Sequence, residues 1–234
     1  MWIIILIIIT IISLIIYGVI PTVIYRIWNK KLKKLRREKE IENIYLTFDD
    51  GVDNKYTTEV LKVLKTYQVQ ATFFVVAEFA KNNPEIIKEI KEDGHIIGLH
   101  SLEHKNEIFQ TPWNIRKDFS KSMDILKELG IKPKFFRPPW GHFSLAAIKE
   151  IKNLNLKIVL WNVIVGDWKA NIDATTIADR LLRETERGDI ICLHDGRGKN
   201  DAPKRTVEAL EIVLPIWKSQ GITFGTLEEL YEQM

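Results

Sequence analysis

The chain has 234 residues, a formal net charge of +3 and a single cysteine, Cys192, which excludes an intrachain disulfide. Residues 1–40 carry eight basic and two acidic side chains, so the rest of the chain has a net charge of −3. The basic character is therefore a local cluster near the N-terminus, and this distribution excludes a basic nucleic-acid-binding domain.

An uncharged apolar segment opens the chain. No charged side chain occurs from Trp2 to about Ile24, and isoleucine and leucine dominate. The segment is long enough to span a bilayer. A signal peptide has a basic start, a shorter apolar core and a small-residue cleavage site, and these features are missing here. We predict an uncleaved single-pass transmembrane anchor over residues 1–25, with a buried helix of a soluble protein as the alternative.

Basic side chains follow the apolar segment directly. They can lie against anionic lipid, so we predict a basic juxtamembrane stem over residues 26–41 that continues the membrane helix as a charged stalk. The partners expected for this part of the chain are the membrane and no nucleic acid.

Residues 42–234 have the size and pattern of one domain in which strands and helices alternate. Thr111 and Pro112 predict the start of a helix, and Gly130 predicts its end. The alternation predicts a parallel α/β sheet or barrel. Strands are expected at 43–48, 71–76, 95–99, 134–137, 157–161, 189–193 and 222–224, and helices at 56–67, 84–93, 112–129, 144–153, 175–187 and 204–219.

Two motifs indicate a metal site. Asp49 and Asp50 follow an apolar strand and precede Gly51, where the chain can turn so that both carboxylates line one pocket. His100 and His104 are spaced to share one face of a helix, a common spacing of metal ligands. One carboxylate and two histidines would leave open positions on a metal ion for water, and the second carboxylate would be free to act as a base.

Three further segments place polar residues at the ends of apolar strands. They are Phe135–Gly141 with its Arg-Pro-Pro, Gly166–Trp168, and Asp189–Gly196, which contains His194. Active sites of α/β folds lie at the carboxyl edge of the strands. Each segment taken alone could be structural, but together they predict one site at this edge.

With these five motifs in this order, the chain from about residue 42 onward resembles the polysaccharide deacetylases, carbohydrate esterase family four, which include chitin and peptidoglycan deacetylases. The resemblance implies an irregular (β/α) barrel of about seven parallel strands. It also implies metal-dependent removal of N-acetyl groups from an N-acetylated glycan, such as a cell-wall or surface polysaccharide.

The resemblance assigns roles to individual residues. It implies that Asp50, His100 and His104 hold one divalent ion, with zinc favoured and cobalt or nickel as alternatives. Asp49 resembles the general base, which Arg137 would hold in place and keep ionised. His194 resembles the general acid, and Asp167 would orient and charge it.

The resemblance also implies a substrate pocket. The backbone N–H of Trp140 matches the position that binds the tetrahedral oxyanion, although a tyrosine is more usual there. Leu193 and Trp168 match the apolar pocket for the acetyl methyl group. His142, two residues after Trp140, has no role in this scheme.

Two questions stay open at the level of the sequence. The positive-inside rule places the basic stem and the domain after it in the cytoplasm, whereas the expected substrates favour an extracytoplasmic domain. The alternatives to a glycan N-deacetylase are a deacylase or deformylase of a lipid-linked amino sugar, and a non-catalytic glycan-binding protein with the same fold.

Overall fold

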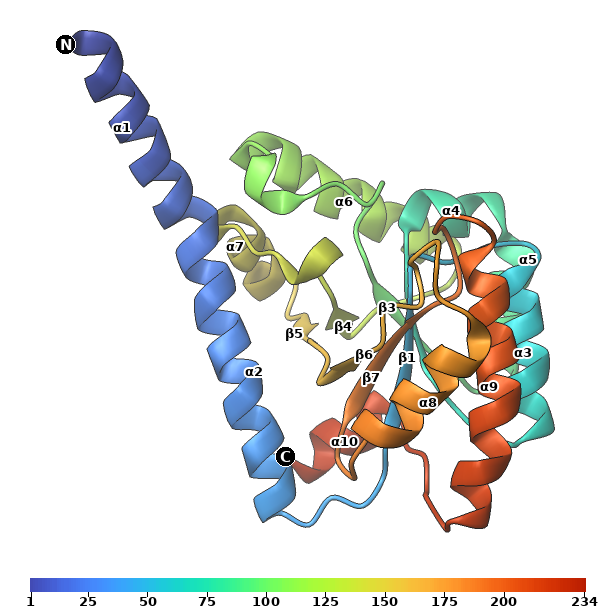
Figure 1. Cartoon of the computed structure of the whole chain (residues 1–234). Helices are drawn as coiled ribbons and strands as arrows, with labels where there is room; N and C mark the ends of the chain where they lie inside the picture. The colour runs from blue at the N-terminus through green and yellow to red at the C-terminus, as the bar shows by residue number, and fades with distance from the viewer.

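The computed structural model describes residues 1–234, and a sheet of seven parallel strands forms its centre (Figure 1). The strands lie in the order β5-β4-β3-β2-β1-β7-β6, and the sheet curls into an incomplete barrel. The prediction of an irregular (β/α) barrel with about seven parallel strands is confirmed. The strands are β1 (Tyr45–Asp49), β2 (Thr72–Val75), β3 (Ile96–Leu99), β4 (Phe135–Phe136), β5 (Lys157–Ile158), β6 (Val163–Ile164) and β7 (Ile190–His194).

One of the predicted strands is wrong. The run at 222–224 makes only an isolated bridge between Phe224 and Ile44, and the seventh strand is instead β6, which pairs with β7. β6 is two residues long and ends the sheet, so its pattern in the sequence is too short to separate it from a loop.

Helices cover the outside of the sheet, and four of them begin at a residue whose side chain caps the helix. Thr111 accepts a hydrogen bond from the backbone N–H of Asn114, and Pro112 occupies the first helical position, as predicted. Gly130 follows the helix end with a φ of 68°. The helices are α3 (Tyr56–Thr66), α4 (Ala77–Asn82), α5 (Pro84–Glu92), α6 (Pro112–Glu128), α7 (Leu145–Asn153), α8 (Ala174–Glu184), α9 (Ala202–Ser219) and α10 (Leu227–Gln233), with 3₁₀ turns η2 (Glu107–Phe109) and η3 (Pro139–Gly141).

The core lies between the sheet and these helices. Phe48 and Phe73, on adjacent strands, stack with ring centroids 5.1 Å apart inside a cluster of 44 buried residues. The register of β1 against β7 places Asp49 opposite His194 at the carboxyl edge of the sheet. Packing of the apolar faces therefore fixes the relative positions of polar residues at the strand ends.

The N-terminal helix has two parts with different surroundings. It comprises α1 (Trp2–Leu14), a π-helical turn η1 (Ile15–Val19) and α2 (Ile20–Glu38). The helix is long and apolar enough to cross a membrane. No residue of α1 is buried, and α1 projects beyond the domain, whereas α2 runs along it (Figure 1).

Specific contacts hold α2 against the domain. Tyr25 stacks on Phe143 with ring centroids 4.6 Å apart, and Asn29 donates to the carbonyl of Trp161 at 2.8 Å. Arg36, which is only 2% exposed, donates to the carbonyl of Gly188 and to Oδ1 of Asn162. These contacts place α2 beside the segment that joins the two edge strands, β5 and β6, so the stem is packed on the domain and is not a free stalk.

Replacing Arg36 by methionine tests this contact. The change keeps most of the side-chain volume but removes the donor to Gly188 O and leaves Asn162 Oδ1 with only the N–H of Ile190. We expect the free energy of unfolding to fall by about 3 kcal/mol. Denaturant unfolding of the full chain in detergent measures this loss. The control is Lys34→Met, because the Lys34 side chain is 79% exposed; equal stabilities of the two variants would contradict the role assigned to Arg36.

Candidate active site

A cleft of about 460 Å³ opens at the carboxyl edge of the strands. It combines titratable side chains with aromatic rings, which is typical of a binding site for a small polar group. Its lining residues come from β1, β6 and β7 and from the segments that follow β1, β3, β4, β5, β6 and β7: Asp49, Asp50, His100, His104, Trp140, His142, Trp161, Ile164, Trp168, Cys192, His194, Arg197 and Gly198.

The two adjacent carboxylates of Asp49 and Asp50 both line the cleft. Asp49 is the last residue of β1, and Asp50 has a φ of 71°, so the chain leaves the pleat between them. Gly51 lies so close to Asp195 that a Cβ atom on Gly51 would be 2.3 Å from Asp195 Oδ2. The glycine therefore lets the turn after Asp50 pack against the segment that follows β7.

The prediction that His100 and His104 share a helical face is wrong. His100 directly follows β3, and the segment to His104 is a loop. Ser101 and His104 have φ values of 98° and 56°, which an α-helix does not allow. The loop is closed by a hydrogen bond from the His104 N–H to Ser101 Oγ, and it still places the two imidazole rings with centroids 5.2 Å apart.

Asp50, His100 and His104 converge on one point. Asp50 Oδ1 lies 2.8 Å from Nε2 of His104 and 3.3 Å from Nε2 of His100, and it is buried without a satisfied hydrogen bond. His100 Nδ1 lies 2.7 Å from the carbonyl oxygen of Arg137, a contact that requires the proton on Nδ1 and leaves the Nε2 lone pair free. This donor set fits a divalent metal ion with three protein ligands.

The protonation of these groups agrees with that fit. Burial alone would raise the pKa of Asp50, but the two imidazoles that face its carboxylate outweigh burial and lower that pKa well below its usual range. Burial lowers the pKa of His104, against the opposing effect of Asp50. These shifts favour a carboxylate at Asp50 and a neutral imidazole at His104, which are the forms that bind metal ions.

Arg137 holds Asp49 on the opposite side from the metal ligands. The guanidinium is fully buried, and its Nη1 donates to Asp49 Oδ1 at 2.6 Å and to Thr47 Oγ1 at 2.8 Å. Its central carbon also lies 4.2 Å from the ring centroid of Phe74. Asp49 Oδ2 lies on the side of His100, whose Nε2 is 4.0 Å away, so one carboxylate oxygen is held and the other faces the ligand set.

His194 and Asp167 form a second polar pair. Asp167 is fully buried, its Oδ1 lies 3.0 Å from His194 Nδ1, and its Oδ2 accepts hydrogen bonds from the His194 N–H and from Thr206. Burial alone would lower the pKa of His194, but the nearby carboxylates, Asp167 above all, raise that pKa to about 9. The imidazole is therefore held in place and protonated at neutral pH.

Aromatic rings form the walls of the cleft. Trp140 is half exposed, has a φ of 56°, and places its ring 4.4 Å from that of His104. The ring of Trp168 lies edge-on to His194 at 5.1 Å. His142 also lines the cleft, and its Nδ1 lies 3.0 Å from Nδ2 of Asn106.

The prediction that Leu193 lines the acetyl pocket is wrong. Leu193 is fully buried in the core cluster, whereas Cys192 and His194 line the cleft. Successive side chains on β7 point to opposite faces, so a residue next to His194 is turned away from the cleft. Cys192 points into the cleft, and its thiol lies 3.4 Å from Asp49 Oδ2.

Two supporting residues have no role in the sequence-based scheme. Asp195 is buried behind the turn at Gly51 and accepts a hydrogen bond from Thr57 at 2.6 Å; burial raises its pKa to about 7. Thr47 bridges Arg137 and the carbonyl of Ile191. Both lie within the segments that carry the motifs, but their partners come from distant parts of the chain, so the sequence does not show what they contact.

A parallel barrel with a cluster of one carboxylate and two histidines at the carboxyl edge of its strands defines a metal-dependent hydrolase of the α/β class. Comparison with known families agrees: the model of the family described as polysaccharide deacetylase matches residues 36–159. The chain belongs to the polysaccharide deacetylase family.

The relatives include peptidoglycan deacetylases. A peptidoglycan-N-acetylglucosamine deacetylase of Bacillus cereus is 36% identical over 81% of this chain and 68% of its own length. The peptidoglycan-N-acetylmuramic acid deacetylase PdaA of Bacillus subtilis is 36% identical over 81% of this chain and 71% of its own length. Among solved structures, a family 4 acetyl xylan esterase from Clostridium thermocellum, in complex with a cobalt ion, has a TM-score of 0.72 and 37% identity, covering 81% of this chain and 90% of that one.

Replacing Gly51 by alanine tests how the turn positions Asp50. The added Cβ would collide with the Asp195 carboxylate, which is buried and bonded to Thr57. We expect the turn to shift and to carry the Asp50 carboxylate away from the two histidines. We expect zinc affinity to fall by about tenfold or more, measured by calorimetric titration of the chelator-treated full chain. The control is Gly221→Ala, because a Cβ atom on Gly221 would have no other atom within 4 Å. The φ of 71° at Gly221 strains an alanine, but this strain lies after α9 and does not touch the metal ligands. Equal zinc affinities for the two variants would contradict the role of the turn.

Proposed function

We propose that this protein is a metal-dependent hydrolase that removes N-acetyl groups from a cell-wall glycan. The observation that carries the proposal is the combination of Asp50, His100 and His104 with a separate carboxylate, Asp49, whose other oxygen is held by Arg137. A site for metal binding alone has no use for a second, anchored carboxylate beside the ligands. The activity of the peptidoglycan deacetylases that the chain resembles supports the same reaction.

Asp50, His100 and His104 would hold the metal ion, for which zinc is our first choice and cobalt or nickel are alternatives. When bound, the ion supplies Lewis acidity toward the amide carbonyl and the attacking water. The cobalt ion in the acetyl xylan esterase structure supports a divalent metal in this family.

Asp49 is proposed as the general base. Arg137 occupies Oδ1, which fixes the carboxylate and leaves Oδ2 to accept the proton of the attacking water. The thiol of Cys192 is the other group near Oδ2, and burial raises the pKa of that thiol well above its usual range, so it stays protonated and does not compete as a base.

His194 is proposed as the general acid. Its pKa of about 9 keeps the imidazole protonated at neutral pH, so it can donate a proton to the nitrogen of the leaving amino sugar. Asp167 acts through His194: it orients Nδ1 and leaves Nε2 directed to the cleft.

The remaining cleft residues are proposed to bind the acetyl group. The backbone N–H of Trp140 would stabilise the oxyanion, and Trp168 would pack against the methyl group. Cys192 takes the place on β7 that the sequence had suggested for Leu193, because Cys192 faces the cleft. A pocket bounded by these side chains admits a small acyl group and does not by itself separate acetyl from formyl.

The N-terminal helix is proposed to anchor the enzyme in the cell membrane as a single span over residues 1–25, followed by the stem at 26–41 and the catalytic domain at 42–234. We place the catalytic domain on the extracytoplasmic side, where cell-wall glycans lie. The positive-inside rule opposes this orientation. The rule counts positive charges near the span, whereas two cations of the stem are bound by the domain: Lys33 pairs with Asp189, and Arg36 bonds to the carbonyl of Gly188.

Acetate release by the full chain in detergent tests the activity. The enzyme is stripped with a chelator, reloaded with zinc, cobalt or nickel, and incubated with chito-oligosaccharides or peptidoglycan. We expect metal-dependent release, and a loss of about 100-fold or more in Asp49→Asn with metal affinity retained. Asp124→Asn, the same change at an exposed position of α6, is the control and should keep full activity.

Three results would contradict this assignment. Full activity of Asp49→Asn would exclude Asp49 as the base. No acetate from any glycan, with one metal ion bound per chain, would favour the deacylase or deformylase of a lipid-linked amino sugar; no metal binding at all would favour a non-catalytic glycan-binding protein.

The pH profile of Asp167→Asn tests the acid. His194 donates only when protonated, so activity of the natural chain falls as pH rises through the His194 pKa of about 9. Without the Asp167 carboxylate, burial dominates and lowers that pKa. We expect the alkaline limb of kcat/KM to move down by roughly two pH units. In the control Asp124→Asn the alkaline limb should not move. An unchanged alkaline limb in Asp167→Asn would show that the pair of His194 and Asp167 is not the source of this limb.

A further inference from the structure

Large apolar side chains are exposed where the N-terminal helix leaves the catalytic domain. Phe109 of η2, Trp113 of α6 and Leu145 of α7 are 75%, 74% and 50% exposed. We refer to these three residues as the apolar patch. Two of them, Trp113 and Leu145, line one shallow groove together with Tyr17 of the helix, whose hydroxyl donates to the carbonyl of Gln110 next to Phe109.

Exposed cations surround this patch. Arg116, Lys117 and Lys121 share a second groove on α6 with Trp113, and no carboxylate lines that groove. Lys149 of α7 lies in the groove of Tyr17 and Leu145, where Glu150 is its one acidic neighbour. Aromatic rings beside lysine and arginine are the composition that proteins present to the headgroup region of a membrane.

The length of the free helix brings the patch to the bilayer. Trp2 to Ile16 is the part of the helix that projects beyond the domain, and at 1.5 Å per residue it is roughly 22 Å long. The hydrocarbon core of a bilayer is about 30 Å thick. The span must therefore include residues from Tyr17 onward, which already touch the domain: Gly18 packs against Ile108, and Thr22 accepts a hydrogen bond from the N–H of Phe143.

The side of the helix that faces away from the domain also indicates that the membrane span extends beyond Tyr17. Ile20, Ile24 and Ile27 are 45%, 57% and 51% exposed, on the side of the helix that the domain leaves open. Trp28, at 55% exposure, ends this apolar stripe just before Lys30 and Lys31. An apolar surface of this length beside the domain has no partner in the chain, and lipid would cover it.

We propose that the apolar patch and the cations of α6 form a membrane-docking surface that seats the catalytic domain on an anionic bilayer. The inference rests on the proposed membrane anchor and not on the proposed reaction. The chosen partner is lipid, because the patch is continuous with the predicted span and because the surrounding charge is complementary to anionic headgroups.

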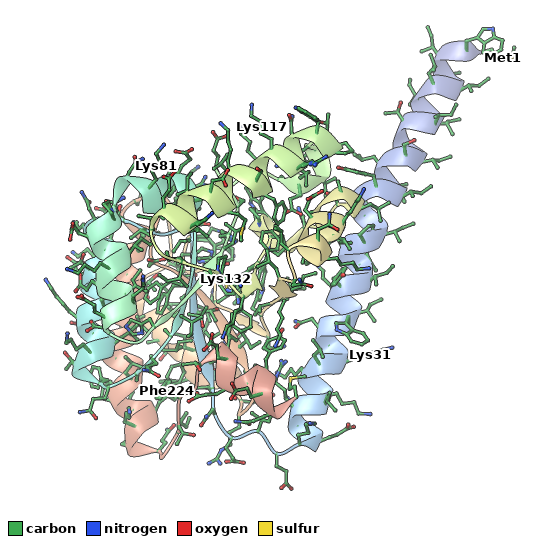
Figure 2. The ribbon with its side chains drawn as sticks, turned by 180° about the vertical axis from the view of Figure 1, so that it is seen from behind. Met1, Lys31, Lys81, Lys117, Lys132 and Phe224 are labelled. Atoms are coloured by element: carbon green, nitrogen blue, oxygen red, sulfur yellow. The ribbon has the colours of Figure 1, made fainter.

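Docking in this way turns the active-site cleft toward the membrane. Phe224 marks the amino edge of the sheet through its bridge to Ile44, and it lies at the end of the molecule opposite Met1 and Lys117 (Figure 2). The carboxyl edge, with the cleft, is thus on the side of the free helix. Arg26 donates to the carbonyl of Trp140 at the cleft, and Arg26 follows Tyr17 by nine residues, or roughly 14 Å along the helix. The cleft would therefore serve sugars held close to the bilayer surface.

Quenching of fluorescence by brominated lipid measures which residues reach the bilayer. The full chain is reconstituted in vesicles of phosphatidylcholine and phosphatidylglycerol, with and without brominated acyl chains. A small fluorophore is attached to single cysteines in Phe109→Cys, Trp113→Cys and Leu145→Cys. The native Cys192 is buried, and labelling of the unsubstituted chain gives the background signal from this thiol. Ile8→Cys in the free helix is the positive reference, and Lys218→Cys, which lies against Phe224, is the negative one.

We expect quenching at the three patch positions to exceed quenching at Lys218→Cys by about threefold or more. Adding both Lys117→Glu and Lys121→Glu to the Phe109→Cys variant should reduce the quenching at position 109 by about half. Patch positions quenched no more than Lys218→Cys would overturn the proposal, as would the absence of quenching at Ile8→Cys. A patch that is unquenched but forms a disulfide-linked dimer through Trp113→Cys would instead be an interface between two copies. The readout uses neither metal nor substrate, so its outcome is independent of the acetate-release assay.

Discussion

The buried ion pair between Arg137 and Asp49 is the constraint on which the geometry of the cleft depends. Two fully desolvated charges are costly unless the pair is well aligned and its remaining donors find partners. Nε of Arg137 bonds to the carbonyl of Val159 after β5, and Nη1 bonds to Thr47 of β1. Nη2 has no hydrogen-bond partner, but the guanidinium lies against the ring of Phe74 on β2. Its own carbonyl oxygen contacts His100 after β3. One side chain and its backbone therefore tie together the ends of several strands, and the metal ligands and the base move with them.

The sequence predicts the site well where a residue ends a strand, because register then fixes its neighbours. Asp49 and His194 are both expected at one edge, and pairing of β1 with β7 puts them opposite each other. The sequence predicts the site poorly where the local backbone conformation determines the direction of a side chain. The spacing of His100 and His104 suits a helix, but left-handed residues make it a loop. Leu193 stands next to His194 in the sequence, and strand alternation sends it to the opposite face.

The N-terminal helix is likewise predicted in part by its sequence pattern and in part only by its contacts with the folded domain. The apolar run and the basic cluster are both visible in the sequence, and they suggest a span followed by a solvated stalk. Tyr25, Asn29 and Arg36 recur at helical spacing and form one face, but their partners are a ring, a backbone carbonyl and an amide from the far half of the chain. Since backbone carbonyls such as that of Gly188 carry no signal in the side-chain pattern, the docking of α2 is visible only in the folded chain.

Four carboxylates lie in or directly behind one small cleft, and their partners decide which of them carries charge. Asp49 has Arg137, Asp50 has two imidazoles and Asp167 has His194. Asp195 has no cation beside it and accepts from the hydroxyl of Thr57, and it is the carboxyl group whose pKa burial raises to about 7. Because like charges this close cannot all persist without compensation, protonation of Asp195 relieves repulsion behind the turn that carries Asp50. Which carboxyl groups are ionised in the cleft therefore depends on the side chains that the strands place beside them. It does not depend on the number of acidic residues in the motifs.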